Sequence, residues 1–281
     1  MVEKAIKDNL PTYDYLDHGR KFFSQNPDKN IFSDAVDGRR VWFKKGGTGK
    51  RTFWHALQGL IATAIKKPIL SVTAIPDGVN AALQESKNLR KFSELGVRAP
   101  DLLAHNDQML VVSHLGTTFS SLLDQTNDLQ ERKKFLLIAV QGLSDMHKKG
   151  LVHGRPYLRD MILCDDGKTG FIDLEETPLA VMNLPQAQAR DVWLFLCSAA
   201  KYARNPDNKY NFNTRLMNEL FAQYSAHADN DTVQELKTFT GFLMPIANLL
   251  QIDFLWRLVG GDARHAVIAT KTSSQVFEEN I

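Results

Sequence analysis

Leu151-Val-His-Gly-Arg-Pro-Tyr-Leu-Arg-Asp-Met-Ile-Leu163 decides the fold, together with Gly170-Phe-Ile-Asp-Leu-Glu-Glu176 shortly after it. In the first piece, His153 is followed by Arg155 and Asp160; in the second, Asp173 ends an apolar run typical of a β-strand. Asp173 alone would be interpreted as an ordinary strand end before an acidic turn. Its position thirteen residues after Asp160 favours a functional role instead.

The residues before this loop combine strands and helices. Residues 1–30 are polar, with a turn signal at residues 26–28. A hairpin is expected over residues 30–44, because Asp37-Gly38 between β-prone runs is a strong turn signal. Helices are expected over residues 52–66 and 79–95. The order therefore indicates a first part that is rich in β-structure.

The residues around and after the loop are expected to be mostly helical. Two short strands around Asn106-Asp107 precede a connector near residues 113–119. A strong amphipathic helix follows over residues 129–149, and the chain is helical again from about Leu184 to its end. A β-rich part followed by a helical part indicates an α+β fold.

The loop motif and this order of elements resemble the protein-kinase-like phosphotransferases, and in particular the bacterial lipopolysaccharide (Kdo/heptose, InaA-type) kinases. The resemblance covers roughly residues 30–200 and is most specific between His153 and Glu176. It implies a bilobal fold, with a small β-rich N-lobe at residues 1–114 and a larger helical C-lobe at residues 115–281. It also implies ATP and Mg²⁺ as cofactors.

The resemblance assigns the metal to two carboxylates. Asp173 corresponds to the main Mg²⁺ ligand, and Asp173-Leu-Glu175 is similar to the Asp-Phe-Glu of small-molecule kinases. Asp160 stands at the second ligand position, where Asn is usual, and still offers oxygen to a hard cation. The alternative interpretation of Asp160 is a helix or turn cap.

Arg155 is the departure from the family pattern, because it stands where the catalytic Asp is usual. Arginine takes up no proton at neutral pH. Three explanations compete: Asp160 orients the acceptor, Arg155 stabilises charge on the transferred phosphoryl group, or catalysis is lost. The resemblance gives His153 a structural task, a hydrogen bond to the metal-binding strand. Contacts of Arg155 with the phosphate position would favour catalysis, and contacts with a distant carboxylate would favour a pseudokinase.

The resemblance also indicates where nucleotide phosphates would bind. Lys44 ends Val41-Trp-Phe-Lys, which resembles the strand whose lysine holds the α- and β-phosphates, and Lys45 on the opposite side is the competitor. Glu85 could form the ion pair of that lysine. Asp191 resembles a buried Asp that binds the backbone of the catalytic loop; a plain helix N-terminal carboxylate is the alternative.

The glycine-rich stretch at residues 46–51 is not a Walker motif, because Lys44 and Arg51 occupy required positions. It follows Lys44, whereas a kinase glycine loop precedes the lysine, so a flexible turn is expected. A phosphate-covering loop would be the hairpin at residues 33–38, which has one glycine.

The composition of the chain indicates its cellular compartment and the classes of partner it can bind. A net charge of +2 does not indicate a nucleic-acid binder, and two cysteines form no disulfide framework, so a cytoplasmic protein is expected. The charged N-terminus lacks the apolar core of a signal peptide. The segment Thr52 to Ile69 has an apolar face with basic ends; it suits a helix packed on the first lobe, or peripheral contact with the inner membrane.

The expected function is phosphoryl transfer from ATP to a hydroxyl acceptor: a lipopolysaccharide-core sugar, a lipid-linked sugar, or a protein Ser/Thr. The alternative is a pseudokinase that acts as a nucleotide-binding or scaffold protein. Arg155 favours the alternative, whereas the retention of Lys44, Glu85, Asp160 and Asp173 argues against it.

Overall fold

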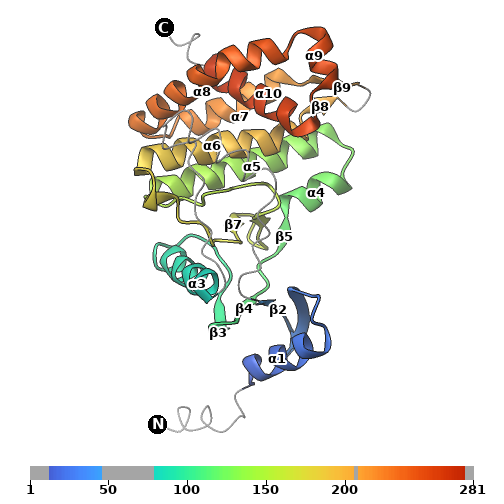
Figure 1. The fold of residues 1–281 in the computed structure, drawn as a ribbon, viewed down its shortest axis with the longest axis vertical. Helices are drawn as coiled ribbons and strands as arrows, with labels where there is room; N and C mark the ends of the chain where they lie inside the picture. Colours follow the sequence, from blue (N-terminus) through green and yellow to red (C-terminus); the bar gives the residue numbers. More distant parts are fainter. Residues whose placement is uncertain (1–12, 46–78, 206–207, 276–281) are drawn as a thin grey trace.

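A computed structural model describes residues 13–45, 79–205 and 208–275 of the chain. It is a mixed α+β structure with small antiparallel sheets, the largest of four strands, and a mainly helical remainder (Figure 1). The glycine-rich stretch at residues 46–51 and the segment Thr52 to Ile69 lie outside the described residues.

The four-stranded sheet has the order β1-β2-β4-β3. β1 (Ile31–Val36) and β2 (Arg39–Lys45) form the predicted hairpin, and Asp37 and Gly38 both adopt positive φ angles, as a two-residue turn between twisted strands requires. β3 (Leu102–His105) and β4 (Met109–Ser113) are the two short strands predicted around Asn106-Asp107. Every pairing in this sheet is antiparallel.

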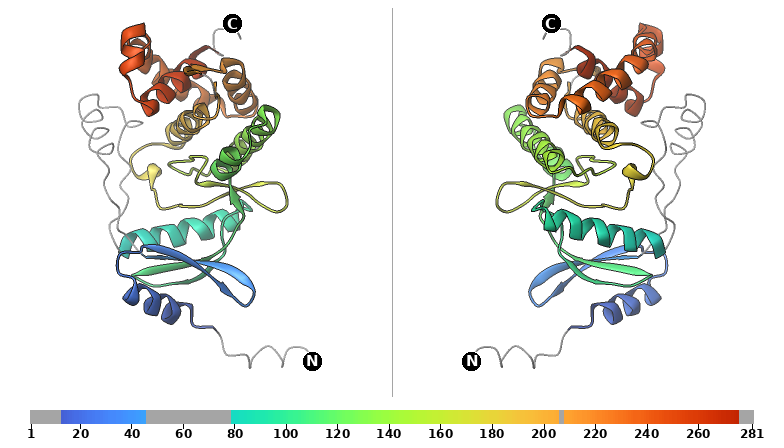
Figure 2. Two further views of the ribbon diagram at one scale, coloured as in Figure 1. Left: turned by 90° about the vertical axis from the view of Figure 1, so that its right-hand side faces the viewer. Right: turned by 90° about the vertical axis from the view of Figure 1, so that its left-hand side faces the viewer.

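Two helices cover opposite faces of this sheet (Figure 2). α3 (Val79–Glu94) is the second of the predicted helices, and Gly96 follows it with φ +65°. α1 (Tyr15–Gln25) lies in the region expected only to be polar, and this helix was missed. Asp14 caps α1 by accepting the N–H of Asp17, and Phe23 packs with buried residues of β2 and β4.

The helical part is built on α5 (Leu129–Lys148) and α6 (Leu184–Ala200), which both contribute to the large core. α7 (Thr214–Ser225) packs on α5, whereas α8 (Asn230–Leu250) and α10 (Gly261–Gln275) pack on α6. The short helices α4 (Phe119–Gln125) and α9 (Asp253–Leu258) complete it.

This part is not wholly helical after residue 184, because β8 (Arg204–Asn205) and β9 (Asn208–Phe212) form a hairpin at the predicted loop. None of the helices in the described ranges has the length and apolar character needed to cross a membrane.

A second small sheet, of order β5-β6-β7, lies between the two parts (Figure 1). Its strands are β5 (Thr117–Thr118), β6 (Met161–Leu163) and β7 (Thr169–Phe171). The N–H of Phe171 donates to the carbonyl of Arg98 at 2.9 Å, which fastens this sheet to the segment after α3. The connection from β4 to β5 contains the expected boundary at residue 114. The loop at residues 151–160 precedes β6, and Asp173 follows β7, so this sheet positions both sequence pieces quoted above.

Candidate functional site

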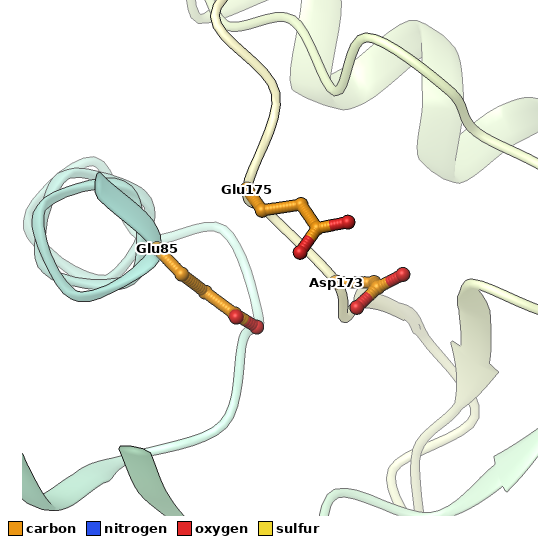
Figure 3. A group of neighbouring side chains, drawn as sticks. All are labelled: Glu85, Asp173 and Glu175. Carbon is orange, nitrogen blue, oxygen red and sulfur yellow. The ribbon is translucent and has the colours of Figure 1, made fainter. Parts of the chain in front are cut away.

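Lys44 at the end of β2 lies at the centre of three carboxylates from distant parts of the chain. Its Nζ donates to Glu85 Oε2 at 2.8 Å and to Asp173 Oδ1, and it lies 3.9 Å from Glu175 Oε2. Figure 3 shows these three side chains converging, Glu85 from α3 and the other two from the segment after β7. Among the described residues, Glu85, Asp173 and Glu175 are the carboxylates whose oxygens lie within 4.8 Å of one another.

Lys45, the sequence competitor, points elsewhere. Its Nζ lies 3.5 Å from the carbonyl oxygen of Pro27 and 5.8 Å from the ring centroid of Phe23. Successive side chains of a strand point to opposite faces, so the two lysines separate. The structure therefore brings Lys44, and not Lys45, to the carboxylates.

The charges around Lys44 and Asp173 hold both groups ionised. Burial disfavours the ammonium of Lys44, but Glu85 and Asp173 outweigh that effect and raise the pKa of Lys44. Burial also disfavours the carboxylate of Asp173, yet Lys44 and Arg155 lower its pKa below the usual value. Burial and the charge of Asp173 raise the pKa of Glu175 to about 7, so Glu175 changes charge near neutral pH.

Asp191 on α6 holds the backbone of the loop that begins at Leu151. It is fully buried, and its two oxygens accept the N–H groups of His153 at 2.7 Å and Gly154 at 2.9 Å. Gly154 has φ +94°, and a Cβ there would lie 2.7 Å from the side chain of Glu176. This is the backbone contact that the sequence resemblance gave to Asp191.

His153 connects the loop to the segment after β7, which carries Asp173. Its Nδ1 accepts the N–H of Arg155 at 3.3 Å, so the ring proton belongs on Nε2, which lies 3.0 Å from the carbonyl oxygen of Ile172. The expected hydrogen bond is therefore present. Through it, the loop and the segment after β7 are held in one arrangement.

Arg155 lies within the site, and the shortest contact of its side chain is with Asp173. Its Nη2 donates to Asp173 Oδ2 at 3.0 Å. Three other carboxylates surround the guanidinium, Glu176 at 3.7 Å, Asp160 at 3.9 Å and Glu175 at 3.9 Å. Asp173 thus has a cation on each oxygen, Lys44 on one and Arg155 on the other.

Asp160 lies beside two guanidinium groups, with its Oδ2 3.9 Å from Arg155 Nε and 3.6 Å from Arg159 Nε. Burial raises the pKa of Asp160, and its Oδ2 has no hydrogen-bond partner among the described residues. The Nε of Arg155 is likewise buried without such a partner. A buried carboxylate oxygen that lacks a donor fits a hard cation, for which oxygen ligands are preferred. Asp160 is not among the described carboxylates whose oxygens lie within 4.8 Å of one another, which are Glu85, Asp173 and Glu175.

Glu175 and Glu176 were not among the site residues predicted from the sequence. Glu176 is buried, lies 3.7 Å from Arg190 Nη2 and packs against the backbone of Gly154. The available signal was a run of three carboxylates, within four residues, directly after an apolar strand. Both residues belong to the site because they add charge beside Arg155.

A pocket of about 230 Å³ opens beside Lys44 and Asp173. Its other walls are mostly apolar and come from both sheets, the connection between them, α3 and the segment after β7. They include Trp42, Leu89, Val112, Leu115, Ile162 and Ile172. Trp42 lies two residues before Lys44, and its Nε1 donates to Nδ1 of His114 at 3.2 Å. The indole therefore spans from β2 to the connection after β4 and limits the size of the pocket.

No protein-family model matches this chain. It is similar to an uncharacterized protein of Haemophilus influenzae (strain ATCC 51907 / DSM 11121 / KW20 / Rd), with 29% identity over 164 residues. The match covers 58% of this chain and 60% of that relative. The likeness carries no assigned reaction, so the functional argument rests on the geometry of the site.

Proposed function

We propose that this chain is an ATP- and Mg²⁺-dependent phosphotransferase with a bilobal, protein-kinase-like fold. The observation that carries the proposal is the meeting of Lys44, Glu85 and Asp173, which come from β2, α3 and the segment after β7. A lysine held by a helix carboxylate, beside an acidic metal ligand, is the arrangement that kinases use on nucleotide phosphates. The apolar pocket next to it is the proposed place for the base.

The proposed roles follow from charge and position. Lys44 would bind the phosphates, with Glu85 orienting its ammonium. Asp173 and Asp160 would hold Mg²⁺, which supplies charge neutralisation at the phosphates when bound. Burial disfavours the charged guanidinium of Arg155, but Asp160 and the neighbouring carboxylates outweigh this effect and raise its pKa. Arg155 therefore stays charged and can stabilise negative charge on the transferred group.

The remaining residues position the loop and do not touch the reacting atoms. Asp191 and His153 fix the backbone on either side of Gly154.

Since Arg155 cannot accept the proton of the acceptor hydroxyl, we assign the orientation of that hydroxyl to Asp160.

The acceptor proposed first is a sugar of the lipopolysaccharide core or its lipid-linked precursor, and a protein Ser/Thr is proposed second. These follow from the sequence resemblance. They are tested by supplying rough-core lipopolysaccharide and a Ser/Thr-rich protein in parallel with radiolabelled ATP. Label in the first acceptor alone supports the sugar, and label in the second alone replaces it.

The chain offers a matched pair of variants for testing the site. Lys44→Met should lower ATP turnover about 100-fold or more, because it removes a charge aimed at the phosphates. Lys45→Met, one residue away on the other face, should leave turnover within about twofold. Asp173→Ala and Asp160→Ala should also abolish turnover. Turnover that survives Lys44→Met and Asp173→Ala would contradict the proposed site.

A pseudokinase is the second candidate, and two observations favour it. Arg155 donates directly to Asp173, so a metal ion must compete with a guanidinium for that oxygen. The pocket, at about 230 Å³, is also below the roughly 300 Å³ at which ligand pockets usually begin. Thermal stabilisation by ATP that is independent of Mg²⁺, without turnover, would establish this function. Trp42→Ala should then strengthen ATP binding by enlarging the pocket.

A further inference from the structure

A second and larger cavity, of about 860 Å³, lies away from the Lys44 site. It is a groove between α5, the segment that follows α3 and the turn from β6 to β7, which neighbour one another in both views of Figure 2. Its floor is apolar and consists of Val97, Leu137, Ile138, Met146 and Phe171. Val97, Met146 and Phe171 are buried core residues, so the groove is built on a rigid base.

The rim of the groove is strongly basic. Six of its residues are cationic and one is acidic: Arg98, Lys133, Lys134, Lys148, Lys149 and Lys168, against Asp145. Asp166 pairs with Arg98 from just outside, Glu219 pairs with Lys133 at 2.7 Å, and Asp145 lies 3.9 Å from Lys148. The Nζ of Lys149 donates to the carbonyl oxygens of Leu95 and Gly96. The cations still outnumber the acids six to three when Asp166 and Glu219 are counted. A chain of net charge +2 thus concentrates positive charge at this groove.

The groove is elongated. Helix α5 lines it from Gln130 to Lys148, nearly its whole length, and this distance is about 27 Å at roughly 1.5 Å per residue. An extended peptide of about eight residues spans the same length at roughly 3.3 Å per residue. Lysines stand toward both ends, Lys133 and Lys134 at one and Lys148 and Lys149 at the other.

We propose that this groove binds an acidic peptide segment of a partner protein. The Asp and Glu side chains of the segment would meet the lysine rim, and its apolar side chains would lie on the floor. Complementary charge along a groove with an apolar floor provides both attraction and register. A lipid bilayer fits less well, because its flat surface would reach the rim and leave the recessed floor unfilled. The inference is independent of the reaction proposed for the Lys44 site.

The test uses a fluorescein-labelled nonapeptide in which leucine and glutamate alternate, with binding to the full chain followed by fluorescence anisotropy. The double variant Lys134→Glu/Lys168→Glu should weaken binding at least tenfold. Both lysines are exposed, so the fold is expected to survive, and circular dichroism checks this. Lys237→Glu, exposed on α8 and outside the groove, is the matched control and should change affinity less than twofold.

Two further arms separate the alternatives. A peptide with serine in place of leucine should bind at least tenfold more weakly, because it makes no apolar contact with the floor. Equal binding of the two peptides would show that the groove binds any polyanion, and would overturn the proposal. The chain should not co-sediment with phosphatidylglycerol vesicles. Sedimentation that the double variant abolishes, with no peptide binding, would make the groove a lipid site. Peptide binding that survives the double variant would also overturn the proposal.

Discussion

Replacement of Arg155 is the sharpest test of how the site is held together. In the folded chain its guanidinium faces four carboxylates: Asp160, Asp173, Glu175 and Glu176. Arg155→Ala removes the cation and leaves these charges partly buried. Arg155→Asp replaces the cation with a carboxylate, the fifth in this group. We therefore expect unfolding free energies in the order wild type, Arg155→Ala, Arg155→Asp, the last being lowest.

The magnitude follows from the contacts. A charge pair about 4 Å apart is worth about 4 kcal/mol at an effective dielectric constant of roughly 20. Removing one partner of a buried pair typically costs about 3–5 kcal/mol. The side chain of Arg155 is 18% exposed, and Asp173 keeps Lys44 as a partner, so the loss should be smaller. We expect Arg155→Ala to cost about 2–4 kcal/mol and Arg155→Asp to cost more.

Urea unfolding at pH 8, followed by tryptophan fluorescence and circular dichroism, measures these differences. Arg159→Ala is the matched control, because Arg159 also lies near Asp160, at 3.6 Å, but is 61% exposed. An exposed ion pair of this kind should cost less than about 1 kcal/mol. If Arg155→Ala costs no more than Arg159→Ala, Arg155 does not hold the carboxylates. An Arg155→Asp variant more stable than Arg155→Ala would refute the electrostatic reasoning altogether.

Three further predictions concern the framework of the site and the helical part. Asp191→Ala strands the buried N–H groups of His153 and Gly154, and urea unfolding should show a loss of about 3 kcal/mol or more; a loss below 1 kcal/mol would contradict it. Gly154→Ala forces a Cβ into a left-handed backbone and against Glu176, so its melting temperature should fall by several degrees; an unchanged value would count against the close packing. Burial lowers the pKa of His265 below 6.5, so the folded state loses stability as the pH falls through 6.5. His265→Gln should remove that part of the acid sensitivity between pH 7.5 and pH 5, and equal sensitivity in both proteins would exclude His265 as its source.

Local turn chemistry made much of the fold predictable. The Asp37-Gly38 pair specified the β1–β2 hairpin, and Gly96 marked the end of α3, because both positions need a positive φ. Helix α1 was missed because polar residues dominate its sequence. Its signals were Asp14 as a cap and the spacing of Gly19, Phe22 and Phe23 on one face.

The site was only partly predictable, because a sequence names residues and not their contacts. The spacing of His153, Asp160 and Asp173 indicated one site, and the strand alternation of Lys44 and Lys45 left a choice between two faces. The pairing of β2 with its neighbours decides that choice. The partner of Arg155 comes from the segment after β7, and nothing local to the loop could reveal it.

The contacts of Lys44 also determine how a ligand would report on folding. Lys44 lies 41 residues from Glu85 and 129 residues from Asp173 along the chain, so an unfolded chain has no such site. A ligand of this site would therefore bind the native state alone. By mass action, a ligand at 100 times its dissociation constant would then add about 2.7 kcal/mol to the free energy of unfolding. The melting temperature of the whole chain thus becomes a direct measure of occupancy, whether or not phosphate is ever transferred.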